Sequence, residues 1–329
     1  MEKVLISIVV PVYSGEKYLE RLAAEIEKVK TGWVADKKPF EVIELVFVND
    51  QCVDNSAAIM EKLKLTYPWI SVVTLSRNFG QHQATAAGCL YTSGDFVVTL
   101  DEDLQHHPVH IESFLRLIAD KGSDIIYARA SGGAHKSFFR DMSSSLYKHI
   151  MYIITGNIYI RNFNSFRFIR GPLARAAASV MKHEGYFDVL LTWYTNSIVS
   201  IELEMRDERY ILEKKSGYSL SKLIRHAKKL FLTSHPKILN SGFYLGILSV
   251  LVSIVYSANI IYEKISDSIP AQGWASSMIA ILFFGGFSLF MLGILIKYIS
   301  ILLLHTHGKP AFFVIDRSKD SILKKYFNT

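Results

Sequence analysis

The chain has 329 residues, of which 50% are hydrophobic, and it carries a formal net charge of +7. Its mean hydropathy of +0.21 is too high for an ordinary soluble protein and too low for a protein built mainly of membrane helices. The positive charge does not indicate nucleic acid as a partner, because much of the basic surplus lies beside apolar C-terminal segments, where anionic lipid would attract it.

Short apolar runs alternate with segments of helical periodicity in the N-terminal part of the chain. Strands are predicted at 5–12, 42–48, 70–75, 96–100 and 124–128, and helices at 15–30, 53–65, 81–91 and 109–121. Strands that are apolar throughout and alternate with helices predict a Rossmann-like α/β fold, with a parallel sheet covered on both faces. No G-x-G-x-x-G motif follows the first strand, so no dinucleotide cofactor is expected. The P-loop motif is also missing, so a P-loop is not expected to bind phosphate.

The fourth predicted strand ends at three acids, Asp101, Glu102 and Asp103. In an extended chain Asp101 and Asp103 point the same way, and two adjacent carboxylates repel each other unless a cation or proton intervenes. Mg²⁺ binds one or two carboxylates together with phosphate oxygens, so the pair predicts a metal and diphosphate site; the alternative is a solvated strand end. His106 and His107 are interpreted as surface residues at a helix start, with metal ligation as the alternative.

Two long apolar stretches occupy 239–262 and 274–304. Each exceeds the roughly 20 residues that cross a bilayer core, which predicts two transmembrane helices; the alternative is a buried hairpin of a soluble protein. Basic residues flank the outer end of each stretch, so both termini are expected on the cytoplasmic side of the plasma membrane. Residues 1–13 lack the features of a signal peptide.

A basic amphipathic helix is predicted just before the first apolar stretch, at 219–235, lying in the lipid headgroup layer with Lys222 near the lipid phosphates. The alternative is a helix packed on the globular domain. The expected domains are therefore a globular domain at 1–218, this interfacial helix, a transmembrane region at 236–304 and a cytoplasmic tail at 305–329.

Four segments resemble glycosyltransferase family 2, and within it the polyprenyl-phosphate glycosyltransferases of the GtrB-like, dolichol-phosphate-mannose-synthase-like and aminoarabinose-transferase-like kinds. The segments are VVPVYSGEKYLERL, VFVNDQCVDNS, LSRNFGQHQATAAGCLYTSGDFVVTLDEDLQHHP and KKSGYSLSKL. The resemblance implies a GT-A fold and a metal-dependent, inverting transfer of a sugar from a nucleotide sugar to a polyprenyl phosphate such as undecaprenyl phosphate. It implies Mg²⁺ or Mn²⁺ as cofactor and suggests a tetramer, but it names neither the sugar nor the nucleotide.

The resemblance also implies roles for individual residues. Donor binding falls to Pro11, Tyr13, Glu16, Asp50, Asp54, Arg77, Asn78, Gln81 and Asp101. Asp101 and Asp103 are implied as metal ligands, and Arg140, Ser216 and Tyr218 are implied as contacts near the lipid acceptor.

Asn164 and Ser165 stand where the family often carries an acid, and Asn49 replaces the first acid of its DDGS motif. A hydroxyl acceptor needs a general base, whereas a lipid phosphate is already anionic at pH 7 and needs positioning and neutralisation. Arg167 and Arg170 lie in this segment, so we expect them to bind the lipid phosphate together with Arg140. Asp103, Arg140 and Arg167 are then the expected catalytic residues. The alternatives are a different lipid or glycan acceptor, or a non-catalytic relative that binds nucleotide.

Overall fold

The computed structural model describes most of the N-terminal region and one long C-terminal helix. The described residues are 2–130, 158–183, 185–203, 273–306 and 309–316, with the single positions Leu248, Leu251, Val255, Ala258 and Tyr262. They fall into two compact units. The first contains the described residues up to Leu203 together with Pro310–Asp316, and the second contains the long helix.

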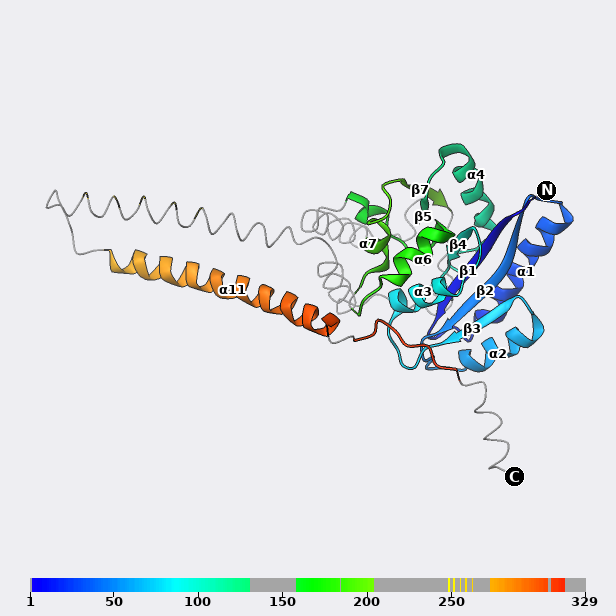
Figure 1. Ribbon diagram of the computed structural model, residues 1–329, viewed down its shortest axis with the longest axis horizontal. Coiled ribbons are helices and arrows are strands. Elements are labelled where there is room, and N and C mark those ends of the chain that lie inside the picture. Colours follow the sequence, from blue (N-terminus) through cyan, green and yellow to red (C-terminus); the bar gives the residue numbers. More distant parts are fainter. Residues whose placement is uncertain are drawn as a thin grey trace, which may run out of the picture. The chain divides into compact units, whose positions relative to one another are not determined.

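In the described residues, seven strands form one sheet with the order β3-β2-β1-β4-β6-β5-β7 (Figure 1). The strands are β1 (Val4–Val12), β2 (Phe40–Asn49), β3 (Ile70–Thr74), β4 (Phe96–Thr99), β5 (Ile125–Ala130), β6 (Arg167–Arg170) and β7 (Ile198–Leu203). Strands β1 to β4 are parallel, β7 is parallel to β5, and β6 is antiparallel to both of its neighbours. The predicted α/β class is confirmed, whereas the prediction of a parallel sheet was wrong for β6.

Helices cover both faces of this sheet, as the apolar strands require. On one face lie α1 (Leu19–Ala35), α2 (Ser56–Thr66) and α4 (Ile111–Lys121), which share one apolar cluster. On the other face lie α3 (Gln81–Leu90), α6 (Gly171–Ser179) and α7 (Phe187–Leu191), which share a second cluster (Figure 1). Within β1, Ile8 belongs to the first cluster and Val9 to the second, because successive strand side chains point to opposite faces.

The carboxyl ends of β1, β2 and β4 meet at one edge of the sheet. The register pairs Val12 with Asn49 and Val9 with Thr99. Beyond the strands, the backbone N–H of Asp50 donates to the carbonyl of Val12 at 3.0 Å. The loops that follow these three strands therefore emerge side by side, at the edge where parallel sheets bind their ligands.

A segment near the C-terminus pairs with the chain at β3, the outermost strand on one side of the sheet. Val314 forms an antiparallel bridge with Leu75. The N–H of Ser76 donates to the carbonyl of Phe313, and the N–H of Ile315 donates to the carbonyl of Thr74, both at 2.9 Å. Part of the expected tail at 305–329 is thus a component of the first unit, and the edge of β3 is covered at these positions.

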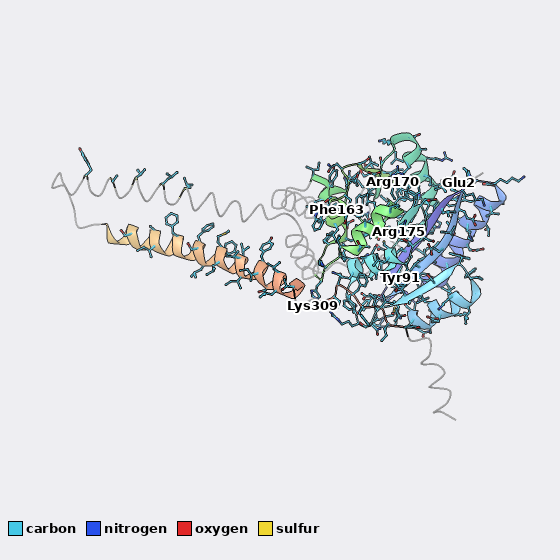
Figure 2. All side chains as sticks on the ribbon, in the orientation of Figure 1. Glu2, Tyr91, Phe163, Arg170, Arg175 and Lys309 are labelled. Atoms are coloured by element: carbon cyan, nitrogen blue, oxygen red, sulfur yellow. The ribbon has the colours of Figure 1, made fainter. Side chains whose placement is uncertain are left out.

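The second unit contains α11 (Trp274–Thr306), a helix of 33 residues that coincides with the second predicted apolar stretch. Figure 2 shows its described side chains projecting from the helix. Within the part of the chain that the structure describes, no helix combines the length and hydropathy of a membrane span, so the expected two spans are not supported there. The interfacial helix at 219–235, and all of 239–262 except five single positions, lie outside the described residues.

Candidate active site

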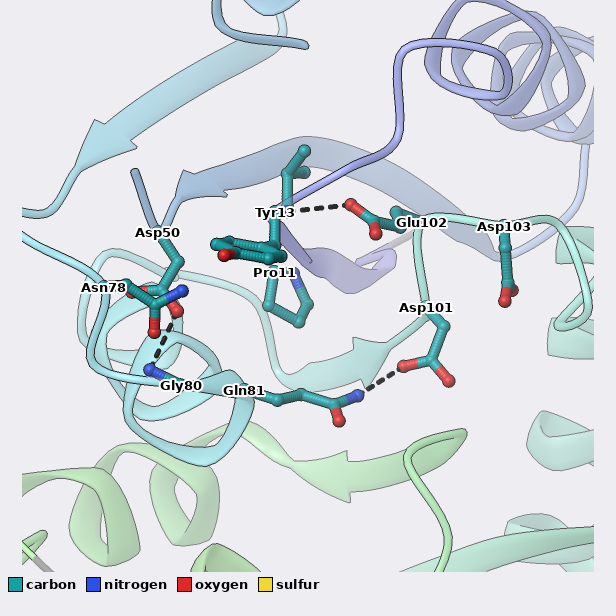
Figure 3. A pocket seen from close by; sticks show the side chains of 10 residues that line it. Pro11, Tyr13, Asp50, Asn78, Gly80, Gln81, Asp101, Glu102 and Asp103 are labelled. Atoms are coloured by element: carbon teal, nitrogen blue, oxygen red, sulfur yellow. Dashed lines mark hydrogen bonds between the residues drawn. The ribbon is translucent and has the colours of Figure 1, made fainter. Parts of the chain in front are cut away.

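A cavity of about 300 Å³ opens at the edge where β1, β2 and β4 end (Figure 3). Its lining residues are Pro11, Val12, Tyr13, Asp50, Asn78, Gly80, Gln81, Asp101, Glu102 and Asp103. Of these ten, four are acids and none is Lys or Arg. The cavity therefore favours a cation, or an anionic ligand only when a cation accompanies it.

Asp101 follows β4, and its carboxylate is held from two sides. The amide of Gln81, the first residue of α3, donates to Oδ1 at 2.7 Å, and the hydroxyl of Ser165 donates to Oδ2 at 2.6 Å. Because each carboxylate oxygen has a second lone pair, both can still ligate a cation. The backbone N–H of Asp101 donates to Nδ1 of His106 at 3.2 Å, which fixes the main chain as well.

His106 is buried, with 3% of its surface exposed, and its ring stacks on Phe166 with ring centroids 4.9 Å apart. The expectation of a surface residue was wrong for His106, because its imidazole supports the turn that carries Asp101. His107 does lie at a helix start, since its Nδ1 accepts the N–H of Val109 and caps the short 3₁₀ helix η1 (Pro108–His110), and it is half-buried.

Asp103 lines the same cavity, and its Oδ1 accepts the N–H of Gln105 at 3.2 Å. Among the described residues, no group of three or more His, Cys, Asp or Glu side chains could hold a metal ion. Two carboxylates nevertheless fit Mg²⁺ or Mn²⁺, because such ions take one or two carboxylates and complete their shell with phosphate oxygens and water. Asp101 and Asp103 are the residues that would hold the cation.

Asp50 lies on the opposite side of the cavity from Asp101 and is buried (Figure 3). Its carboxylate accepts the N–H groups of Phe79 and Gly80 at 2.7 and 2.8 Å. Gly80 has φ +96°, a conformation that favours glycine, and it directly precedes α3. Asp50 thus shapes the loop that carries Asn78 into the cavity, in addition to lining the cavity itself.

Glu16 and Asp54, both expected to contact the donor, are not among the lining residues and instead tie two loops together. The Glu16 N–H donates to Asp54 at 3.2 Å, and the Asn55 N–H donates to Glu16 at 2.9 Å. Burial alone would raise the pKa of Asp54, but hydrogen bonds from the hydroxyl and N–H of Ser56 and from the Glu16 N–H hold that pKa below its usual value. Arg77 also lies outside the lining, and its guanidinium is 4.1 Å from the ring centroid of Phe79.

Arg167 does not line the cavity and is not placed to bind a lipid phosphate. Its side chain is buried, and Nε and Nη2 donate to the two oxygens of Asp188 at 2.6 and 2.8 Å. Nη1 donates to the Thr99 hydroxyl at 3.1 Å, and that hydroxyl donates to the carbonyl of Ser165. The expected catalytic role of Arg167 is therefore corrected to a structural one, because a buried guanidinium with these partners is not offered to a ligand.

Arg170, labelled in Figure 2, is placed at the wrong end of its strand for the role predicted from the sequence. β6 runs antiparallel to β4, so Arg170 pairs with Phe96 at the start of β4, while Asp101 follows the end of β4. Its Nε donates to Asp124 at 2.8 Å. The other residues expected to lie near the lipid or its phosphate are outside the described residues; they are Arg140, Ser216, Tyr218 and Lys222.

Two contributors to the site were missed from the sequence. Glu102 lines the cavity and accepts the N–H groups of Tyr13 and Ser14, and no motif signals that contact. The sequence identifies Ser165 only as a substitute for an acid, whereas in the structure it is a hydrogen-bond partner of Asp101. Asn164 instead binds the backbone: its amide donates to the carbonyl of Ala128 at 3.0 Å.

Comparison with known proteins gives a consistent picture. Residues 7–175 match the family described as glycosyl transferase family 2. The bactoprenol glucosyl transferase of Shigella phage SfX is 27% identical over 95% of this chain and 99% of its own length. The uncharacterized glycosyltransferase YkcC of Bacillus subtilis (strain 168) is 27% identical over 94% of this chain and 92% of its own.

Among solved structures, mannosyl-3-phosphoglycerate synthase from Rubrobacter xylanophilus has a similar fold. The TM-score is 0.50 at 12% identity, and the match covers 69% of this chain and 71% of that chain. This likeness concerns the fold alone, and it agrees with the expected GT-A architecture of the first unit.

Proposed function

Because this chain belongs to glycosyltransferase family 2, we propose that it transfers a sugar from a nucleotide sugar to a polyprenyl phosphate. The observation that carries this proposal is the cavity in which Asp101 and Asp103 lie opposite Asp50 and Tyr13, with no basic lining residue among those described. A nucleoside diphosphate needs a divalent cation to enter such a site, and the two aspartates suit one. The name of the phage relative, a bactoprenol glucosyl transferase, supports the acceptor.

The two sides of the cavity suggest how the donor lies. Pro11, Tyr13, Asp50 and Asn78 gather on one side, and Asp101 and Asp103 on the other (Figure 3). We place the nucleoside against the first group and the diphosphate beside the aspartates. The cation, when bound, balances the charge that develops on the departing nucleoside diphosphate. Gln81 and Ser165 orient Asp101 in advance, so little reorganisation accompanies the reaction.

The polar groups near Asp101 support a lipid phosphate as the acceptor. Ser165 and Asn164 stand in place of an acid, and their polar atoms are used on Asp101 and on the backbone. A lipid phosphate supplies its own anionic nucleophile, so inverting attack on the sugar needs no general base there. Since Arg167 is occupied by Asp188, neutralisation of that phosphate falls to Arg140 and Lys222 in this proposal.

We also place the protein at a membrane. Large apolar side chains of α11 are exposed by 60–71%, and they are Ile281, Leu289, Phe290 and Leu302. Large apolar side chains exposed along a long helix are normally covered by protein or lipid. Lipid is the cover that suits an enzyme whose acceptor has its polyprenyl tail in the bilayer. Flotation of the purified chain with liposomes tests this, and recovery of the chain in the protein-only fraction would contradict it.

The activity is tested with the purified full chain in detergent, undecaprenyl phosphate, Mg²⁺ or Mn²⁺, and a panel of UDP-, GDP- and dTDP-sugars. We expect lipid-linked sugar from one donor and loss of that product with EDTA. Asp103→Asn should lower turnover about 100-fold or more, because it removes an anionic ligand of the cation. Asp36→Asn, which changes an exposed acid, serves as the charge-matched control.

Each alternative has its own result. Metal-dependent nucleotide binding with no transfer to undecaprenyl phosphate would point to a different acceptor. Failure to bind any of the nucleotide sugars would leave the chain without the proposed activity.

A further inference from the structure

Glu102 lies between the two aspartates in the sequence, but its carboxylate contacts a different loop (Figure 3). Oε2 accepts the N–H of Tyr13 at 2.8 Å and the N–H of Ser14 at 3.2 Å, and Oε1 lies 3.3 Å from the nitrogen of Ser14. Both N–H groups belong to the loop between β1 and α1. Hydrogen bonds from backbone N–H groups to a carboxylate are charge-assisted and stronger than those to a neutral acceptor.

The next residue of the loop is a glycine that leaves room for this contact. A Cβ atom added to Gly15 would lie 2.9 Å from Oε2 of Glu102 and 3.2 Å from its Cβ. Any larger residue at position 15 would thus push the carboxylate away from the two N–H groups. Gly15, which has no side chain, thus leaves the space that the Glu102 carboxylate occupies.

The same loop is held from its other side by the segment after β2. The N–H of Gly15 donates to the hydroxyl of Ser56 at 2.9 Å, and Glu16 exchanges hydrogen bonds with Asp54 and Asn55. Tyr13, which lines the cavity with 43% of its surface exposed, is therefore placed by contacts on two sides. The contact with Glu102 connects Tyr13 to the segment that carries Asp101 and Asp103.

We propose that Glu102 is a positioning residue for the nucleotide: by binding the backbone of Tyr13 and Ser14, it sets the nucleoside side of the cavity relative to the cation side. It acts through these two N–H groups and does not ligate the cation. This inference rests on the proposed function, since it takes the cavity to be the nucleotide site.

The test compares the full wild-type chain with Glu102→Ala, Glu102→Gln and Gly15→Ala. Glu41→Gln is the charge-matched control, because Glu41 lies near the start of β2, at the opposite edge of the sheet, and pairs with Lys3. Titration calorimetry with Mn²⁺ gives the Kd for UDP, GDP and dTDP. Glu102→Ala and Gly15→Ala should each raise the Kd of the nucleotide that binds by about tenfold.

Glu102→Gln separates hydrogen bonding from charge. Its amide oxygen still accepts the Tyr13 N–H, so its Kd should stay within about threefold of wild type, and Glu41→Gln should change nothing. In turnover assays Glu102→Ala should raise the KM for the donor and leave kcat nearly unchanged, because the contact positions the ground-state nucleotide. A purely structural defect would not produce this separation of KM from kcat.

Hydrogen exchange reports on the contact itself. Without nucleotide, the amides of Tyr13 and Ser14 should exchange about tenfold faster in Glu102→Ala than in wild type, with exchange in β2 unchanged. The inference is overturned by an unchanged nucleotide Kd in both alanine variants, or by Glu102→Gln as weak as Glu102→Ala with Gly15→Ala unaffected. If wild type bound none of the nucleotides, the proposed function would fail, while the exchange rates would still show whether Glu102 holds the loop.

Discussion

The hydroxyl of Ser165 donates a hydrogen bond of 2.6 Å to Oδ2 of Asp101, the carboxylate that we place at the cation. Ser165 precedes β6 and Asp101 follows β4, and these strands are antiparallel neighbours, so the two residues meet at the same edge. Partners of this kind orient a ligating carboxylate before the ion arrives.

Ser165→Ala should therefore weaken Mn²⁺ binding by about tenfold, since loss of an outer-shell partner typically costs that much or more. Electron paramagnetic resonance in the presence of UDP measures free Mn²⁺ directly. Ser165→Thr keeps the hydroxyl and is the matched control. Equal Mn²⁺ affinity in wild type and Ser165→Ala would show that Gln81 alone is sufficient to orient Asp101.

Arg167 and Arg170 lie on the same short strand in different environments. Replacing each in turn therefore compares a buried ion pair with a partly exposed one. Arg167→Ala leaves the buried Asp188 without its ionic partner and should lower the free energy of unfolding by about 3–5 kcal/mol. Arg170→Ala removes a partly exposed pair with Asp124 and should lower it by less than about 1 kcal/mol. Urea unfolding followed by tryptophan fluorescence gives both values. A stable Arg167→Ala variant with a raised KM for the lipid phosphate would restore the role first predicted from the sequence.

Much of the sheet and the acidic cavity could be predicted because their signals are local. The apolar runs specify β1 to β4, and the acids at the end of β4 mark the edge where parallel strands present ligand-binding residues. Pro11, Tyr13, Asn78 and Gln81, which the resemblance assigns to donor binding, also line the cavity, and their role in binding the donor stays a prediction. Pro11 lies near the end of β1, and the other three residues lie in a loop or helix start that follows a strand the sequence identifies.

The parts that could not be predicted depend on contacts between distant segments. β6 has four residues with an arginine at each end, and no pattern shows that it inserts antiparallel between β4 and β5. Arg167 was predicted to bind the lipid phosphate, because the sequence does not show that the fold brings Asp188, 21 residues later, against it. The contact of Glu102 with Tyr13 joins positions 89 apart, for which one sequence carries no signal.

The two cysteines should be unreactive in the folded chain. Burial raises the pKa of Cys52 to about 12, with added repulsion from Glu102 and Asp54, and burial raises the pKa of Cys89 to about 12. At pH 8 roughly one thiol in ten thousand is then ionised, against about one in four for an unperturbed thiol. Iodoacetamide at pH 8, followed by mass spectrometry, should modify both residues in urea and neither in the native chain. Rapid alkylation of the native protein would contradict these pKa directions.

The same shifts imply a dependence of stability on alkaline pH. An unfolded thiol ionises near pH 8.5, whereas the folded thiols keep their protons to about pH 12. Each cysteine thus contributes stability that is present below pH 8.5 and is lost as the pH rises toward 12. Cys89→Ala should show a smaller loss of unfolding free energy between pH 8 and pH 10 than wild type. An identical slope in the two proteins would contradict the prediction.

The contact between the C-terminal segment and β3 should contribute to the stability of the first unit. Ile315→Pro removes the N–H that donates to Thr74 and fixes φ, while Ile315→Ala removes only the side chain, so their difference reports mainly on the backbone pairing. We expect the proline variant to be less stable than the alanine variant by about 1 kcal/mol in urea unfolding. The proline variant should also show faster hydrogen exchange at Ser76, because the segment that supplies its acceptor, the carbonyl of Phe313, would separate from the chain beside β3. Equal stability and equal exchange in the two variants would mean that the hydrogen bond from the Ile315 N–H adds nothing to the stability of the sheet.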